Sequence, residues 1–192
     1  MNEGGHWPKW AADLSNDVLA ATLPDRLAHC LAVGATARMT ARMLCPATEE
    51  ETLAAAGVLH DIGYAPHLVQ TGHHAIDGAR YLARIGVAEP VVSLVAYHSC
   101  AAVEAQMRLL DDQLREFDPP SDSFVADVLT FADMTTGPTG LAISTAERFE
   151  DILRRHGEAS LTGRFLQQAR GGLEESVGRV EVRLRIARAR VA

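Results

Sequence analysis

Apolar residues recur every three to four positions along most of the chain, and helix start and stop signals separate the runs. Pro24 fits the first turn of a helix over about residues 25–44. Thr48 and Glu51 have the spacing of a capping box for the next helix, which runs into His60. The first part of the chain therefore predicts consecutive helices.

The same pattern continues through the middle of the chain. A third helix is expected to begin near Thr71 and to close at Gly86, and Pro90 starts the apolar run VVSLVAYH. An amphipathic segment follows over residues 101–117. The loop DPPSDS then supplies a cap for the helical run SFVADVLTFAD.

The last third of the chain begins with a loop, MTTGPTG, and returns to helix. Ser144 and Glu147 form a second capping box, which opens AERFEDILRRHG. The tail is amphipathic, and we expect Gly171 and Gly172 to interrupt it. Its apolar stripe is expected to pack on the same chain, with a homodimer seam as the alternative. No alternating apolar and polar run indicates a strand, so the predicted fold class is all-α.

Length and charge limit the partners of this chain. Its 192 residues, 47% of them hydrophobic, suit one domain over residues 1–192. A formal net charge of −7 and a pI near 5.6 argue against a nucleic-acid polymer or an anionic membrane as the main partner, since both need a basic surface. A small anion remains compatible, because bound metals can reverse a local field.

We expect a cytoplasmic location, because no targeting signal is recognised in the sequence and because of the spacing of its cysteines. The N-terminal segment has no apolar core flanked by basic residues, and the longest apolar runs are too short to span a bilayer. Three cysteines without a CxxC spacing suit a reducing compartment and argue against a thiolate zinc site.

Ligand-type side chains fall at the ends or on the apolar faces of five predicted helices. They are His29, His60, Asp61, His74, His98 and Asp133. His60 and Asp61 face small or apolar neighbours, where an ionised carboxylate needs a cation or a hydrogen-bond donor. Imidazole and carboxylate groups together suit divalent iron, manganese, zinc or cobalt. A bridging carboxylate can hold two such ions about 3.5–4 Å apart.

The order of these residues, with HDIG as the central motif, resembles the HD-domain superfamily of metal-dependent phosphohydrolases. The resemblance covers roughly residues 22–140 and leaves residues 141–192 as a C-terminal helical extension. It implies an HD-domain helical bundle in which several helices contribute metal ligands. The additional histidine pair, His74 and His98, makes the chain similar to the dinuclear subgroup.

The resemblance also implies a role for each ligand. His29, His60, Asp61 and Asp133 would hold one metal, and Asp61 would bridge to a second metal completed by His74 and His98. The implied cofactors are two divalent transition metals, iron or manganese first, with zinc, cobalt or nickel as alternatives. The implied reaction is two-metal hydrolysis of a phosphate ester or anhydride in a small phosphorylated metabolite, for which we expect a nucleotide, with Asp61 as a catalytic residue. We add Arg26 as a second catalytic candidate because of its position before His29.

Departures from the superfamily's subgroups narrow the function. IGYAP lacks the glutamate that single-metal nucleotidases place after the doublet, and the longer motif of cyclic-di-GMP phosphodiesterases is incomplete. A di-iron oxygenase is the first alternative, but its relatives place a tyrosine and a glutamate before the first histidine, and residues 19–28 contain neither. A non-catalytic metal-binding module is the second alternative.

Several residues near the motif have two interpretations. Arg26 lies one turn before His29, so it either points toward a metal-bound phosphate or is a solvated arginine of the first helical turn. Glu104 is an acid candidate, but an exposed carboxylate is favoured. Thr135 and Thr136 fit an ordinary helix-ending loop better than a binding loop. The unmatched histidines are expected to be exposed or structural: His6, His67, His73 and His156.

Overall fold

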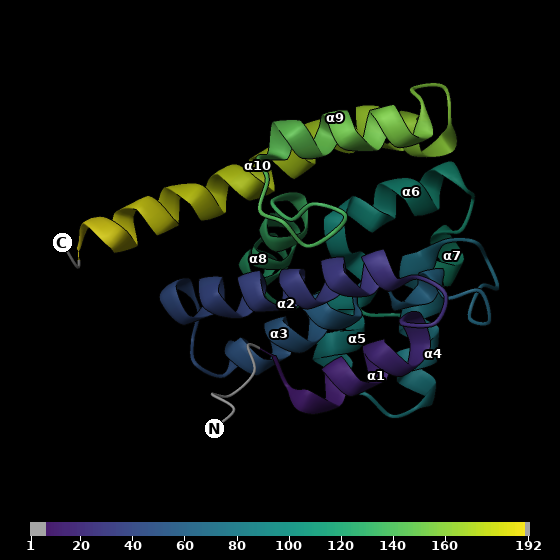
Figure 1. Ribbon diagram of the computed structural model, residues 1–192, viewed down its shortest axis with the longest axis horizontal. Coiled ribbons are helices and arrows are strands. Elements are labelled where there is room, and N and C mark those ends of the chain that lie inside the picture. Colours follow the sequence, from purple (N-terminus) through teal and green to yellow (C-terminus); the bar gives the residue numbers. More distant parts are fainter. Residues whose placement is uncertain (1–6, 191–192) are drawn as a thin grey trace.

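The structure is a computed structural model that describes residues 7–190 (Figure 1). The helices up to residue 100 are α1 (Lys9–Leu19), α2 (Pro24–Leu44), α3 (Glu49–Leu59), the 3-10 helix η1 (Ile62–Tyr64), α4 (His74–Arg84), α5 (Glu89–Tyr97) and the 3-10 helix η2 (His98–Cys100). The later helices are α6 (Ala101–Met107), α7 (Asp111–Leu114), α8 (Ser123–Met134), α9 (Thr145–His156) and α10 (Leu161–Ala189). Within residues 7–190 there is no strand, only an isolated bridge between Thr136 and Ala142, so the all-α prediction is confirmed.

Helices α2 and α3 approach each other closely through a pair of glycines. A Cβ atom on Gly57 would lie 2.8 Å from the Cα of Gly34, and one on Gly34 would lie 2.4 Å from Cγ2 of Val58. Only glycine leaves room for this contact between two backbones. The close crossing brings His29 of α2 beside His60 at the end of α3, with 5.3 Å between the ring centroids.

The main hydrophobic core lies between α2, α3, α4, α5 and α8. Its largest fully buried side chains include Leu53, Leu59, Ile76, Leu82 and Leu129. Burial of such side chains contributes about 1.5–3 kcal/mol each. The core therefore holds in place the helix ends from which the candidate ligands project.

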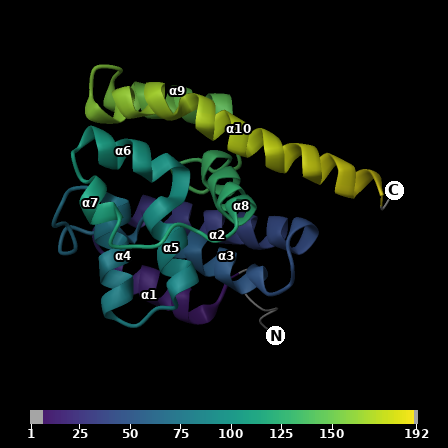
Figure 2. The same ribbon diagram turned by 180° about the vertical axis from the view of Figure 1, so that it is seen from behind.

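The C-terminal helices cover one side of this bundle. In Figures 1 and 2, α9 and α10 run along the same edge of the molecule, above α6, and the last part of α10 extends beyond the other helices. A second buried cluster joins these helices to the end of α8: Met134, Phe149, Leu166, Ala169, Leu173 and Val177. The apolar stripe of the tail thus packs on the same chain.

The sequence predictions missed or misplaced several helix boundaries. Helix α1 was not expected, and α4 begins at His74, three residues later than Thr71, because the Asp77 carboxylate binds the backbone amides of Gln70, Thr71 and Gly72 and holds them outside the helix. The capping box at Thr48 is wrong, because Thr48 already has helical backbone angles and its side chain makes no cap hydrogen bond. The capping box at Ser144 is confirmed.

Two further predictions concerned helix continuity. The segment over residues 101–117 is not one helix, since Leu109 has a φ of 59° and separates α6 from α7. The expected interruption at Gly171 and Gly172 is wrong, because both lie inside the continuous α10. A Cβ on Gly172 would stand 3.4 Å from the sulfur of Cys100, which is an ordinary van der Waals contact with η2. Among the described helices, none is long and apolar enough to cross a membrane.

Candidate metal centre

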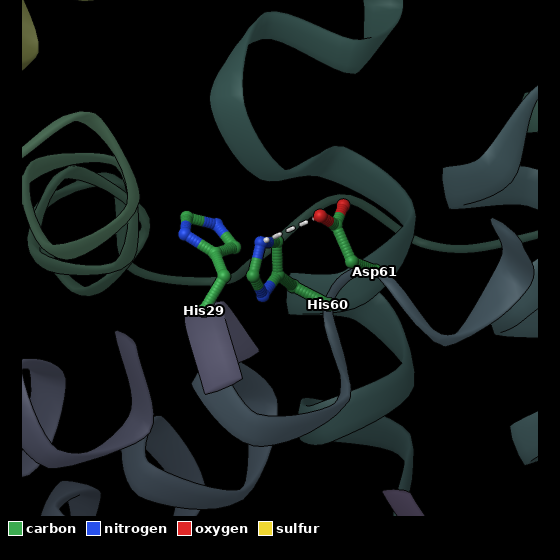
Figure 3. A group of neighbouring side chains, drawn as sticks. All are labelled: His29, His60 and Asp61. Carbon is green, nitrogen blue, oxygen red and sulfur yellow. Dashed lines mark ion pairs between the residues drawn. The ribbon is translucent and has the colours of Figure 1, made fainter. Parts of the chain in front are cut away.

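The structure brings all the predicted ligands together in one buried group. His29 comes from α2, His60 and Asp61 from the end of α3, His74 from the first residue of α4, His98 from the start of η2 and Asp133 from the end of α8. All but the half-buried His74 are buried. Figure 3 shows the imidazoles of His29 and His60 beside the carboxylate of Asp61.

The first cluster consists of His29, His60 and Asp61, with Asp133 next to it. The candidate ligand atoms of His29, His60 and Asp61 all lie within 4.8 Å of one another. Oδ1 of Asp133 is 3.2 Å from Nε2 of His29 and 3.8 Å from Nε2 of His60. Two ligand atoms that share a metal at bond lengths near 2.1 Å are roughly 3–3.5 Å apart. The separation of 3.2 Å from His29 falls in this range, and the others are somewhat longer, so the group is close to the size that a common ion requires.

The second cluster consists of Asp61, His74 and His98. Oδ1 of Asp61 is 3.4 Å from Nε2 of His74 and 3.8 Å from Nε2 of His98. Its other oxygen, Oδ2, is 3.5 Å from Nε2 of His60 in the first cluster. Asp61 thus presents one oxygen to each cluster, which is the geometry of a bridging carboxylate.

Backbone carbonyl groups orient three of the imidazoles. The Nδ1 atoms of His29, His60 and His98 lie 2.9, 2.8 and 2.7 Å from the carbonyl oxygens of Gly137, Gly57 and Val95, respectively. A carbonyl can only accept, so each Nδ1 carries the proton and each neutral ring keeps a lone pair on Nε2. Such a bond to the second ring nitrogen is typical of metal-binding histidines.

Among the described residues, the Nε2 of His60 has no hydrogen-bond partner, and the Nε2 atoms of His74 and His98 have only each other. Nε2 of His60 is fully buried and makes no hydrogen bond. The Nε2 atoms of His74 and His98 face each other at 3.1 Å, an arrangement that needs a proton or a cation between two lone pairs. A buried polar atom without a partner costs about 1–3 kcal/mol. Metal binding would satisfy all three nitrogen atoms.

Burial and mutual proximity keep these groups in their ligand forms. Burial lowers the pKa of His60 to about 4 and places the pKa of His74 well below its ordinary value. Burial alone would raise the pKa of Asp61, but His60 and Arg26 hold it far below its usual range. At neutral pH His60 and His74 are therefore neutral imidazoles, and Asp61 is an ionised carboxylate.

Comparison with known proteins gives a family for this geometry. The sequence profile described as the HD domain matches residues 26–137. The chain belongs to the HD-domain family. This places it in a superfamily of metal-dependent phosphohydrolases and agrees with a His and Asp cluster that can bind divalent metal. No curated protein and no solved structure matches the chain significantly.

Arg26 lies at the rim of the HD-domain site and is not a freely solvated residue. Its Nη1 donates to Oδ2 of Asp61, and its guanidinium stacks 3.8 Å from the ring centroid of Tyr64. Tyr64 in turn stacks on His74, with 4.2 Å between ring centroids. The structure thus favours the interpretation of Arg26 as a residue of the site.

Three contacts of the site were missed by the sequence analysis. The Oγ of Ser99 donates to Oδ2 of Asp133 over 2.6 Å, and Nη2 of Arg148 lies 3.5 Å from Oδ1 of the same carboxylate. Tyr64 follows the HDIG motif directly, so its position in the sequence could have indicated it. Arg148 lies outside the matched residues 26–137, and no local signal marks it.

The other described histidines and the two threonines singled out in the sequence lie outside the ligand group. His73 is fully buried, its Nδ1 accepts from the amide of Ile76 at 3.4 Å, and its Nε2 lies 3.1 Å from the carbonyl oxygen of Ala101, so it is structural. His67 and His156 are exposed, whereas His6 lies outside the described residues. The hydroxyls of Thr135 and Thr136 donate back to carbonyls of α8, as expected for a helix-ending loop.

A cavity of about 210 Å³ opens beside the metal cluster. Asp61, His74 and His98 line one side, and Ile152, Phe165 and Leu166 of the C-terminal helices line the other. Glu104 also lines this cavity, with a side chain only 14% exposed and bonded to Nε of Arg108 at 2.7 Å, so the expectation of an exposed carboxylate is wrong. The C-terminal extension therefore contributes part of the wall of the pocket.

Proposed function

We propose that this HD-domain protein is a two-metal phosphohydrolase that cleaves a phosphate ester or anhydride in a small soluble metabolite, a nucleotide. The observation that carries the proposal is the position of Asp61 between two histidine clusters, with one carboxylate oxygen toward each. Two-metal hydrolases use a pair of ions about 3.5–4 Å apart to act on one phosphoryl group. A single-metal site would leave His74 and His98 without a purpose.

The donor set of the site fits two divalent transition metals. His29, His60, Asp61 and Asp133 would hold one ion, and Asp61, His74 and His98 would hold the other. Nitrogen and carboxylate ligands without sulfur favour iron or manganese, and zinc, cobalt or nickel are also compatible. The Nε2 atom of His60 supports this assignment, because it is buried and has no hydrogen-bond partner within residues 7–190.

The metals and the surrounding residues would have separate tasks. When bound, two divalent ions polarise phosphoryl oxygens and lower the pKa of a coordinated water toward neutrality. Arg26 is partly exposed at the rim, so its guanidinium can donate hydrogen bonds to a phosphoryl oxygen while it contacts Asp61. Tyr64 holds Arg26 and His74 by stacking on both and restricts their side-chain freedom.

The cavity supports hydrolysis over the di-iron oxygenase alternative. Its lining includes four arginines, which suit a phosphorylated substrate and have no evident use in the oxidation of a neutral organic molecule: Arg26, Arg108, Arg148 and Arg155. The cytoplasmic location and the possible homodimer, both expected from the sequence, remain predictions. The cavity volume of about 210 Å³ suits a small metabolite.

The experiment that tests the proposal is phosphate release by protein reconstituted with manganese under anaerobic conditions. We expect inorganic phosphate from at least one of a panel of nucleoside mono-, di- and polyphosphates, at a rate that dioxygen does not change. Redox-silent ions suffice for Lewis-acid catalysis, whereas oxygenation needs electrons from iron. Iron-dependent consumption of dioxygen with no phosphate release would refute the hydrolase proposal in favour of the oxygenase.

A further inference from the structure

Helix α9, which lies outside the matched HD-domain residues, turns one face toward the metal cavity. Arg148, Ile152 and Arg155 follow one another at intervals of four and three residues and all line that cavity. Residues at this spacing lie on the same side of a helix. The neighbouring Arg154 lines neither this cavity nor the adjacent one, and its side chain is 75% exposed.

Arg148 is a buried cation whose hydrogen-bond donors are largely unused. The residue is 8% exposed, and among the described residues its Nε and Nη1 atoms have no hydrogen-bond partner. Its Nη2 reaches Asp133 only at 3.5 Å, and its Nη1 lies 4.0 Å from Asp151. A buried guanidinium whose N–H donors lack hydrogen-bond partners lowers the stability of the fold unless an anion binds to it. The position of Arg148 therefore indicates a binding partner inside the pocket.

Two cavities meet at a common set of arginines. Beside the metal cavity lies a second cavity of about 410 Å³, lined by residues that include Pro24 and Thr139. Arg26, Arg148 and Arg155 line both cavities. An extended substrate with one end at the metals would thus pass the three guanidinium groups on its way into the second cavity.

The charge around the metal cavity opposes the acidic character of the chain. Although the chain has a formal net charge of −7, four arginines and three carboxylates line this cavity: Arg26, Arg108, Arg148, Arg155, Asp61, Glu104 and Asp133. Two divalent metals would add further positive charge. Partial burial together with the charges of Arg155 and Arg26 lowers the pKa of His156, which also lines the cavity. The pocket therefore suits a polyanion.

We propose that Arg26, Arg148 and Arg155 form a second phosphate-binding subsite beside the metal centre, so that the substrate carries at least two linked phosphoryl groups. This inference rests on the proposed function and narrows its substrate to a phosphoanhydride. One phosphoryl group lies at the metals and the next lies among the arginines. Guanidinium groups bind phosphate well, and Nε and Nη1 of Arg148 have no partner among the described residues. Arg26 and Arg155 already contact Asp61 and Asp151, so they would bind a phosphate through their remaining donors.

The subsite also accounts for the leaving group. Hydrolysis would form a bond from the oxygen of water to the phosphorus nearest the residues that would hold the metals, and would break the bond from that phosphorus to the bridging oxygen. The bridging oxygen leaves with the electron pair on the phosphate among the arginines; one water proton passes to solvent and the other stays on the released phosphate. A phosphate has a second pKa of about 6, so it leaves as an anion without an acid. This agrees with Glu104, whose carboxylate is already bonded to Arg108.

The test compares the binding of imidodiphosphate, which resists hydrolysis, with that of orthophosphate. Isothermal titration calorimetry on the manganese-loaded full chain measures both affinities. We expect imidodiphosphate to bind at least about tenfold more tightly, and Arg148→Gln and Arg155→Gln each to reduce that preference by about tenfold. Arg154→Gln is the matched control, because it removes a neighbouring arginine that lines neither cavity, and it should leave the preference unchanged.

Thermal unfolding of each variant checks that the fold is retained. If Arg148→Gln does not fold, Arg155→Gln carries the test, because the Arg155 side chain is 34% exposed and its loss leaves no buried cavity. Equal affinity for the two anions in the unmodified protein, or the same preference in Arg155→Gln as in Arg154→Gln, overturns the subsite.

The outcomes separate this inference from the proposed function. Release of phosphate from nucleoside monophosphates without any preference for imidodiphosphate would refute the subsite and leave the hydrolase proposal intact. Arginine-dependent preference for imidodiphosphate in a protein that releases no phosphate from the whole panel would support the subsite and refute the hydrolase proposal.

Discussion

Ser99 donates a hydrogen bond from its Oγ to Oδ2 of Asp133 across 2.6 Å, although the residues are 34 positions apart in the sequence. Ser99 and the following Cys100 both have left-handed backbone angles, with φ values of 46° and 62°. Such angles cost about 1–2 kcal/mol at a residue other than glycine. At this position the Ser99 hydroxyl binds Oδ2 of Asp133, while Oδ1 of the same carboxylate faces His29 and His60.

Removal of this hydroxyl should weaken metal binding. We expect Ser99→Ala to lower metal affinity by about 10- to 100-fold, because the carboxylate loses the bond that orients it. Competition with a chelator measures the affinity. Ser93→Ala is the matched control, since it removes a buried serine hydroxyl that bonds to the carbonyl of Asp118 and not to a candidate ligand. An equal loss in both variants would contradict the positioning role of Ser99.

Asp61→Ala should abolish hydrolysis and loosen both metals. Within residues 7–190, the substitution removes the one carboxylate that belongs to both histidine clusters, and it takes away the acceptor of Nη1 of Arg26. Steady-state phosphate release and elemental analysis measure the two effects. Asp127→Ala is the control, because it also removes a buried carboxylate, one bonded to Arg179 at 2.7 Å by each oxygen. Activity retained in Asp61→Ala would refute the assignment of Asp61.

The glycine contact between α2 and α3 should be sensitive to a single methyl group. We expect Gly57→Ala to lower the free energy of unfolding by about 1–3 kcal/mol, because its Cβ would meet the backbone of Gly34 at 2.8 Å. Denaturant unfolding measures the change. Gly178→Ala, in open space within α10, should instead raise the free energy by about 0.5–1 kcal/mol. Destabilisation of similar size in both variants would argue against the close crossing.

Part of the fold could be predicted from local signals in the sequence. Pro24 and the capping box at Ser144 mark helix starts that depend on their immediate neighbours alone, and the structure agrees. The capping box predicted at Thr48 is absent because the preceding turn at Pro46 already gives Thr48 helical backbone angles. The glycines at 171 and 172 failed to break α10 because the flanking Leu166 and Leu173 are buried against other helices. Tertiary packing overrides weak local preferences in such places.

The candidate ligands could be recognised from their residue types and order, because metal-binding groups on helix ends restrict the chemistry strongly. The surroundings of the site could not. Arg148 reaches Asp133 only because the second hydrophobic cluster holds α9 and α10 over the pocket. That packing joins residues distant in sequence, and a periodic apolar stripe does not specify which surface will cover it.

The stability of the metal-free protein should fall as the pH decreases from 6.5 to 4. In the unfolded chain His60 takes up a proton near pH 6.5, but in the fold its pKa is about 4. The unfolded state therefore binds more protons over this range, and His60 alone contributes a loss of about 3 kcal/mol. His74, whose pKa is also lowered, acts in the same direction.

Urea unfolding of chelator-treated protein at several pH values measures this dependence. His60→Gln should flatten the profile between pH 6.5 and 4, whereas His67→Gln should not, because His67 lies on the surface. A profile for His60→Gln with the same slope as the unmodified protein would show that His60 is not held neutral by burial.

Elemental analysis of the full-length protein, reconstituted with manganese and freed of unbound ions, tests the dinuclear assignment most directly. The account predicts close to two ions per chain. It predicts about one in His74→Ala, since that variant loses a ligand of the second cluster only, and again two in the surface control His67→Ala. At most one tightly bound ion in the unmodified protein, or an unchanged content in His74→Ala, would contradict a metal pair bridged by Asp61.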